Sequence, residues 1–198
     1  QVASRIRDLI ATDQFTPGTP LKEVNLCKQL SVSRTPLREA LKQLIAEGLV
    51  EQIPYRGMVV CNPDQASIEQ MLELLGALEG FAGEMACLRA TPEEIVAIRV
   101  LTQQMHETYE NDERLSYYKI NQSIHRSIVE FSTNGELIRS HERLNSRLYR
   151  IRFLSNRRTD RWHTAIEEHD AILRNLVQRE GLKLNKLLRA VSYTHLRA

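Results

Sequence analysis

The spacing of apolar residues predicts a mainly helical chain, with its clearest helix over residues 34–47. Apolar residues recur there at i, i+4, i+7 and i+8, which places them on one face that must pack inward. Ser33 is a good N-cap, Pro36 is tolerated in the first turn, and Gly48 ends the helix. The residues of the apolar face are Leu37, Leu41, Leu44 and Ile45.

Shorter elements on either side of this helix complete a small domain. A tight turn, Ser31-Val32-Ser33, joins helix 34–47 to the helix before it, and a Pro-Tyr-Arg-Gly turn separates two short strands after it. Helix, turn, helix and two-stranded wing is the layout of a winged helix-turn-helix, which we assign to residues 1–62. The other predicted elements are helices over residues 2–10 and 21–30 and strands over residues 49–51 and 58–60.

The second half of the chain shows helical spacing and no convincing strand. Short connections between long amphipathic helices predict an antiparallel six-helix bundle, which we assign to residues 63–190. The predicted helices span residues 64–89, 91–109, 113–132, 135–156 and 160–179, and a sixth begins near Leu182.

Composition narrows the class of protein. At 198 residues the chain is long enough for two domains that each bury a core. Its formal net charge of +2 is nearly neutral, so any affinity for DNA must come from local placement of charge. Its 3 cysteines include no Cys-x-x-Cys pair, which argues against a disulfide framework and fits a reducing, cytoplasmic location. No apolar run approaches the ~20 residues needed to span a membrane, and no signal peptide is visible.

Helix 34–47 also carries a basic face, on which Arg34, Arg38 and Lys42 recur every four residues. Taken alone, such a face is most often an ordinary solvated surface. The preceding helix and turn, and the wing that follows, favour DNA recognition instead. The DNA major groove is wide enough to admit one helix, so this face is a candidate to read base edges.

The stretch PGTPLKEVNLCKQLSVSRTPLREALKQLIAEGLV, followed by YRGMVV, resembles the N-terminal domain of the GntR family of bacterial transcription regulators. The resemblance covers nearly all of residues 1–61, and SRTPLREAL is its most specific part. It implies that two arginines contact bases, two hydroxyl side chains touch phosphates and a wing glycine approaches the minor groove. In that order these residues are Arg34 and Arg38, Ser33 and Thr35, and Gly57.

Three segments of the helical half, LELLGALEGFAGEMACLRATPEEI, NQSIHRSI and RWHTAIEEHDAIL, are similar to the FCD domain of the FadR branch of that family. This resemblance covers about residues 64–190. It implies a six-helix domain that binds a small effector and takes part in forming a homodimer. A homodimer would place two recognition helices on a palindromic double-stranded operator.

Three polar residues lie within or beside the apolar stripes of the helical half. His169 lies in a stripe with Ile166 and Leu173, and Asn121 and His125 lie one turn apart beside another stripe. Hydrogen-bonded core residues are one explanation, and ligands of a shared metal ion are the other. The FCD resemblance implies the second. Nitrogen and oxygen ligands of this kind suit zinc, nickel or manganese.

Two positions depart from the metal-binding FCD pattern. Most metal-binding members have Asp where this chain has Asn121, which leaves a neutral oxygen ligand. The last histidine of the family pattern should fall near residue 191, where this chain has Val191. The final stretch VSYTHLRA, residues 191–198, is interpreted as foreign to the fold. We therefore expect its deletion to leave the melting temperature nearly unchanged.

The helix predicted over residues 135–156 is rich in arginine. Most of these side chains must be solvated, but Arg147 and Arg152 flank the apolar stripe most closely. We expect these two to reach a cavity and hold a small carboxylate effector, since arginine forms two parallel hydrogen bonds with that group.

These features favour a ligand-responsive transcription regulator, a repressor, over an enzyme. The sequence shows no nucleophile–base pair and no glycine-rich phosphate loop, and two histidines with one amide make a poor hydrolytic centre. Two alternatives stay open. One is a metal-dependent enzyme with a DNA-targeting module, and the other is a DNA-binding protein whose helical half only dimerises.

Overall fold

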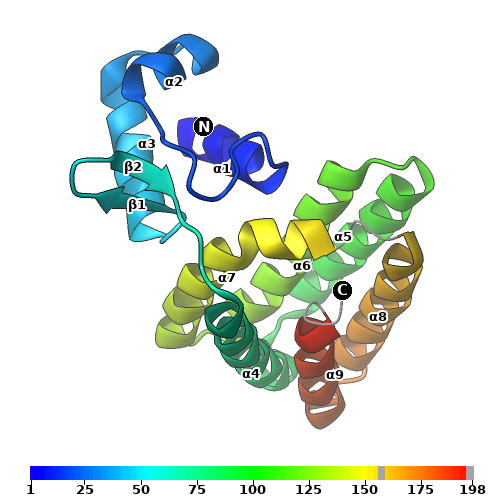
Figure 1. Ribbon diagram of the computed structural model, residues 1–198. Helices are drawn as coiled ribbons and strands as arrows, with labels where there is room; N and C mark the ends of the chain where they lie inside the picture. Colours follow the sequence, from blue (N-terminus) through cyan, green and yellow to red (C-terminus); the bar gives the residue numbers. More distant parts are fainter. Residues whose placement is uncertain (156–158, 195–198) are drawn as a thin grey trace. The chain divides into compact units, whose positions relative to one another are not determined.

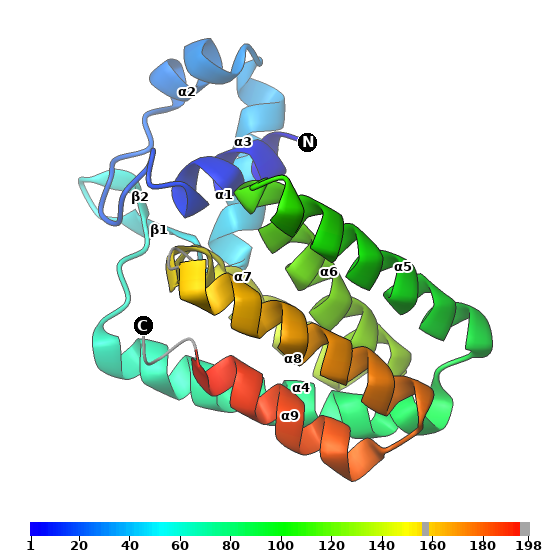
Figure 2. The same cartoon turned by 90° about the vertical axis from the view of Figure 1, so that its right-hand side faces the viewer.

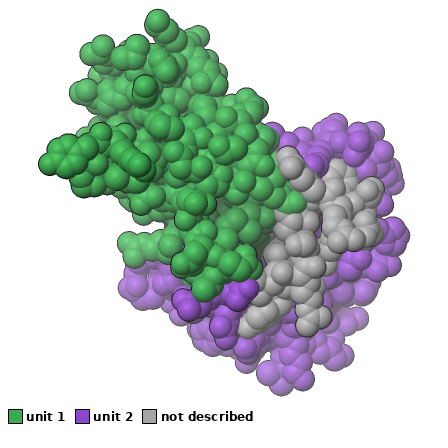
Figure 3. All heavy atoms as spheres, viewed as in Figure 1, with its two compact units in different colours: residues 1–68, 142–154 green, residues 69–141, 155–198 purple. Residues whose placement is uncertain are grey.

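The computed structural model describes residues 1–155 and 159–194. The chain divides into two compact units (Figure 3). Unit 1 comprises residues 1–68 and 142–154, and unit 2 comprises residues 69–141 and 155–198. Helices make up most of both units, which confirms the predicted fold class. Within the described ranges, no helix is both long and apolar enough to cross a membrane.

Unit 1 contains the winged helix-turn-helix, which consists of three helices and a two-stranded hairpin (Figure 1). The strands pair antiparallel, with Val50 opposite Val60 and Ile53 opposite Gly57. The element ends differ slightly from those predicted, as helix ends commonly do. The elements are α1 (Val2–Ala11), α2 (Glu23–Leu30), α3 (Arg34–Ala46), β1 (Val50–Ile53) and β2 (Gly57–Val60).

Helix α3 is held by the apolar face that its spacing predicts. Leu37, Leu41 and Leu44 are fully buried and pack in one core with residues of α1, α2 and the hairpin. Ser31 adopts a left-handed conformation, with φ 55°, which makes the sharp turn between α2 and α3. Ser33 occupies the N-cap position as expected, but its side chain makes no capping hydrogen bond.

In the residues that the structure describes, the helical half forms the six predicted helices (Figures 1 and 2). Thr91 and Glu94 form the capping box that starts α5: each side chain accepts a hydrogen bond from the backbone of the other residue. Helices α5, α6, α8 and α9 share one core, to which they contribute Ile98, Ile124, Ile172 and Leu184. The helices are α4 (Gln65–Arg89), α5 (Pro92–Glu110), α6 (Arg114–Phe131), α7 (Gly135–Ser155), α8 (Thr159–Val177) and α9 (Gly181–Thr194).

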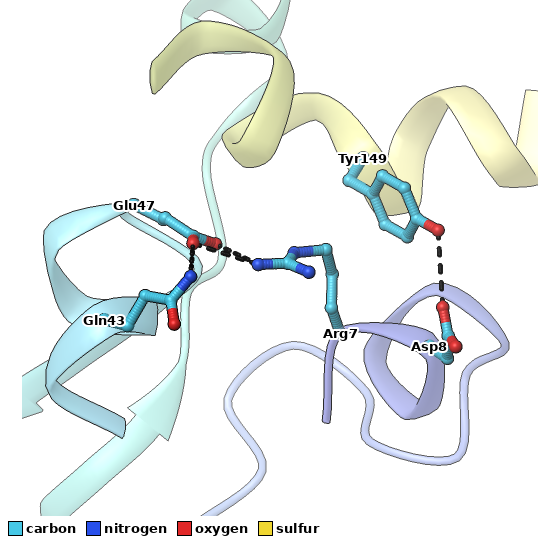
Figure 4. Close-up of polar contacts among 5 residues, drawn as sticks. All are labelled: Arg7, Asp8, Gln43, Glu47 and Tyr149. Carbon is cyan, nitrogen blue, oxygen red and sulfur yellow. Dashed lines mark hydrogen bonds and ion pairs between the residues drawn. The ribbon is translucent and has the colours of Figure 1, made fainter. Parts of the chain in front are cut away.

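Unit 1 includes a segment of the predicted helical half, because the second half of α7, residues 142–154, packs with residues 1–68. Tyr149 donates a hydrogen bond to Asp8 of α1, with an O–O distance of 3.3 Å (Figure 4). Arg150 forms an ion pair with Asp13, with an N–O distance of 2.6 Å. Burial, and then the Asp8 carboxylate, raise the pKa of Tyr149, so this phenol stays protonated at neutral pH.

Residues 191–194, interpreted from the sequence as the start of a foreign stretch, form the last turn of a helix in the structure. Helix α9 continues to Thr194, and both Val191 and Ser192 are buried. Val191 follows Leu184 and Leu188 at i, i+4 and i+7, so the helical phase is kept rather than abandoned. Deleting this stretch should therefore lower the melting temperature. Residues 195–198, with His195, lie outside the described residues.

Glycines let α9 pack closely on α4. A Cβ at Gly80 would lie 2.6 Å from the Cγ of Arg189 and 3.0 Å from the backbone oxygen of Asn185. A Cβ at Gly76 would lie 3.2 Å from the Cβ of Ser192. The two helix backbones therefore approach each other at positions where side chains of α4 are absent, and this brings Ser192 against α4.

Candidate DNA-binding surface and buried ligand site

The predicted DNA-binding residues of α3 all face solvent. Ser33, Arg34, Thr35 and Arg38 are all exposed, while Leu37, Leu41 and Leu44 of the same segment are buried. Arg38 is not simply solvated, because its Nε lies 3.0 Å from both carboxylate oxygens of Glu23 on α2. This ion pair limits the directions in which the guanidinium can point.

The wing tip is the second exposed part of this surface. Gly57 has φ 78°, a conformation that favours glycine, and no atom lies within 4 Å of the position a Cβ would take. Tyr55 beside it is fully exposed, also with positive φ. Tyr55 and Arg56 were not singled out from the sequence, although their place in the Pro-Tyr-Arg-Gly turn puts them at the tip.

The three predicted metal ligands are all buried in unit 2. Asn121 and His125 come from α6 and His169 from α8, and their exposed fractions are 3%, 1% and 1%. The two imidazole rings meet edge to face, with centroids 5.2 Å apart. Nδ1 of His169 lies 2.6 Å from the backbone oxygen of Ala165. A carbonyl oxygen only accepts, so this nitrogen carries the proton and, in the neutral ring, Nε2 carries the lone pair.

Sequence reasoning missed a buried carboxylate beside these residues. Glu79 of α4 is 1% exposed, and its Oε1 lies 3.1 Å from Nε2 of His141. Its Oε2 accepts a hydrogen bond of 2.8 Å from the hydroxyl of Ser192 and lies 3.0 Å from Nδ1 of His125. The sequence offered one indication of this buried carboxylate: Glu79 is a charged residue four positions after Leu75, within an apolar stripe.

The donor set admits a metal ion, with two nitrogens and one oxygen. Asn121 Oδ1 and His125 Nε2 are buried and make no hydrogen bond. Buried polar atoms of this kind require an explanation, and a metal ion supplies one. Among the described residues, no group of three or more His, Cys, Asp or Glu is arranged to hold a metal ion. The amide of Asn121 would therefore have to provide the third ligand.

The two predicted effector arginines both pack in unit 1 rather than in the unit that carries the histidines. The side chain of Arg147 passes over Gly48, where a Cβ would lie 2.9 Å from its Cγ. Arg147 also lines a cavity of about 310 Å³ together with Cys61. Arg152 is fully buried, and its NH1 donates a hydrogen bond of 2.7 Å to Asn145.

Two family descriptions match this chain. Residues 1–60 match "Bacterial regulatory proteins, gntR family", and residues 70–193 match "FCD domain". The second match includes Val191 and Ser192, in agreement with their burial in α9.

Relatives with similar sequences carry the names of transcriptional regulators. The chain is 33% identical to the Nta operon transcriptional regulator of Aminobacter aminovorans over 140 residues, 71% of this chain and 66% of that protein. It is 32% identical to an uncharacterized HTH-type regulator of Agrobacterium vitis over 127 residues, 63% of this chain and 74% of that protein.

Solved structures share the fold of the whole chain. The structure described as E. coli McbR/YncC has a TM-score of 0.84 at 20% identity, covering 98% of this chain and 92% of that one. A GntR regulator from Rhodococcus sp. RHA1, described as putative, has a TM-score of 0.78 at 19% identity, covering 100% and 96%.

Proposed function

Because the chain belongs to the gntR family of bacterial regulatory proteins and carries an FCD domain, we propose that it is a ligand-responsive repressor. DNA binding and transcriptional regulation follow from the family, and the matched families and named relatives are regulators rather than enzymes. The dimer, the palindromic operator, the metal ion and the effector are the proposal. The observation that carries it is the exposed basic face of α3 beside the wing.

In this proposal α3 enters the major groove, where Arg34 and Arg38 contact base edges. The hydroxyls of Ser33 and Thr35 contact phosphates, and Gly57 allows the wing tip to approach the minor groove. Glu23 would hold Arg38 in a limited set of directions before DNA is bound. A restricted side chain loses less conformational freedom on binding than a free one.

An exposed apolar stripe on α4 supports the proposed homodimer. Leu74, Phe81 and Leu88 recur every seven residues, and their exposed fractions are 51%, 45% and 75%. Residues at this spacing lie on one side of a helix, where a second copy of the chain can cover them. A two-fold dimer carries two recognition helices and therefore reads an inverted repeat.

Leu88→Glu is expected to shift the protein from dimer to monomer, because it places a charge in the apolar stripe that the partner would cover. Sedimentation velocity over a concentration series measures the shift. Leu182→Glu is the matched control, since Leu182 of α9 is 70% exposed and lies outside the stripe. A Leu88→Glu protein that stays as dimeric as the control would contradict this assignment of the interface.

We further propose that Asn121, His125 and His169 hold zinc, nickel or manganese. A metal ion held by three ligands keeps open positions and supplies a positive centre to which a small organic acid can bind. Arg147 and Arg152 lie in the other unit, so their effector role stays a separate prediction; Arg152 is buried and bonded to Asn145. An acid that binds one arrangement of the protein better than another shifts operator affinity, which is all that regulation requires.

His169→Ala is expected to lower metal affinity by at least ~10-fold, because it removes one of three ligands. Mass spectrometry of metal content and a zinc titration of the stripped protein measure the loss. His163→Ala is the matched control, since His163 lies on the same helix but is 70% exposed. Equal metal content in both variants would reject the metal site, and the histidines would then be hydrogen-bonded core residues.

Operator affinity measured with and without metal and candidate acids separates this proposal from the alternative of a DNA-binding protein whose helical half only dimerises. The proposal expects at least one combination to change the dissociation constant by ~5-fold or more, the lower end of usual coupling energies.

A further inference from the structure

Among the side chains that the structure describes, Glu79 is the one buried acidic residue. A buried carboxylate is costly unless donors surround it. Two elements supply donors here, α7 through His141 and α9 through Ser192, and Nδ1 of His125 on α6 lies 3.0 Å from Oε2. The hydrogen bonds from His141 and Ser192 already stabilise the carboxylate in the core. They do not explain why His125 also lies beside it.

The contact with His125 determines where its imidazole carries a proton. Nδ1 lies 3.0 Å from Oε2 of Glu79, although the two atoms are not aligned as a hydrogen bond. A lone pair on Nδ1 would face the carboxylate at this distance and be repelled. The neutral ring therefore carries its proton on Nδ1 and its lone pair on Nε2. His169 has the same arrangement, imposed by the backbone oxygen of Ala165.

We propose that Glu79 is a positioning residue, whose carboxylate fixes the Nδ1–H tautomer of His125 and so keeps its Nε2 lone pair for a bound metal ion. This inference rests on the proposed metal site of Asn121, His125 and His169. Metal-bound histidines commonly donate their second nitrogen to a carboxylate or a carbonyl group, which fixes the tautomer and the ring orientation. In this chain the carboxylate of Glu79 faces Nδ1 of His125, and the carbonyl group of Ala165 faces Nδ1 of His169.

The carboxylate is itself held in place. Ser192 donates to Oε2 and His141 pairs with Oε1, so the plane of the group is set by α9 and α7 together. The absence of a side chain at Gly76 brings Ser192 near enough, because a Cβ there would lie 3.2 Å from the Cβ of Ser192. His141 pairs with Glu79 through Nε2 and is not part of the proposed ligand set.

An amide in place of the carboxylate should reverse the tautomer. A carboxylate only accepts hydrogen bonds, whereas the glutamine of Glu79→Gln has one oxygen acceptor and one NH₂ donor. With its oxygen retained by His141 at the place of Oε1, the NH₂ group takes the place of Oε2, faces Nδ1 of His125 and requires a lone pair there. The proton then moves to Nε2, where it blocks metal binding.

The test uses the full-length protein labelled with ¹⁵N-histidine and stripped of metal. Long-range ¹H–¹⁵N NMR at about pH 8 reports which imidazole nitrogen carries the proton, and the His125→Gln spectrum assigns the signal. A zinc titration of the same samples gives the affinity. The matched control is His141→Phe, which removes another neighbour of Glu79 without touching the proposed ligands.

We expect His125 to be the Nδ1–H tautomer in the wild-type protein and the Nε2–H tautomer in Glu79→Gln. Zinc affinity should fall ~10- to 100-fold in Glu79→Gln, and Glu79→Asp, which keeps an acceptor, should retain the wild-type tautomer. His141→Phe should leave the tautomer unchanged. A purely structural role would lower the melting temperature without changing the tautomer.

The inference is overturned if wild-type His125 is the Nε2–H tautomer or doubly protonated, or if Glu79→Gln keeps both the wild-type tautomer and the wild-type affinity. The wild-type spectrum decides the first point even if Glu79→Gln does not fold. A tautomer that switches in a protein without zinc affinity would support the role of Glu79 and reject the proposed metal site.

Discussion

Arg34→Ala should weaken binding to the cognate operator by about 1–3 kcal/mol per subunit contact, roughly 5- to 150-fold, and relax sequence preference at one base step. Arg34 is exposed as the first residue of α3. In the DNA major groove, an arginine at this position donates two hydrogen bonds to a guanine. Fluorescence anisotropy with cognate and scrambled duplexes at one fixed salt concentration measures both effects.

Arg38→Ala should cost at least as much, because it also leaves the Glu23 carboxylate unpaired near the DNA phosphates. Lys22, the exposed residue just before α2, supplies the control: as a contact with phosphates it should, when changed to alanine, weaken cognate and scrambled duplexes by the same factor. If both arginine variants kept wild-type discrimination between the duplexes, α3 would not be the element that reads the sequence.

Gly80→Ala should destabilise the protein by about 1–3 kcal/mol, because overpacking a close contact forces side chains and backbone to move. The added Cβ would meet the Arg189 side chain at 2.6 Å and the backbone oxygen of Asn185 at 3.0 Å. The side chain can turn away, but the backbone of α9 must shift. Thermal unfolding followed by circular dichroism measures the change.

Gly135→Ala is the matched control for this substitution, since its Cβ would meet only the flexible guanidinium of Arg139 at 3.3 Å. It should be neutral or slightly stabilising, as glycine is the poorer helix former. A Gly80→Ala protein as stable as this control would show that α9 does not pack closely on α4. The hydrogen bond from Ser192 to Glu79 would then lack the close helix packing that brings the two residues together.

Helix positions were predictable because helical periodicity is a local property of the sequence. The stripe of Leu37, Leu41 and Leu44 defines both the buried face of α3 and, by exclusion, the exposed face with Arg34 and Arg38. The interpretation of residues 191–198 as foreign to the fold rests on their composition, whereas Val191 keeps the helical phase of α9.

The buried site was predictable only in part. Asn121, His125 and His169 stand out because each interrupts or borders an apolar stripe of its own helix. Glu79 pairs with His141 across 62 positions of sequence, and no local period reports such a pairing. Arg147 and Arg152 were placed by their distance from the stripe of α7, but packing with unit 1 decides their surroundings.

The most direct test of the account is selection of preferred sequences by the purified protein from a pool of random DNA duplexes. The account predicts enrichment of an inverted repeat whose half-sites are centred about one helical turn, roughly 34 Å, or a multiple of it apart. Arg34→Ala should lose enrichment at one position in each half-site. A pool that shows no enriched sequence, or one asymmetric site with no inverted repeat, would contradict recognition of an operator by a two-fold dimer.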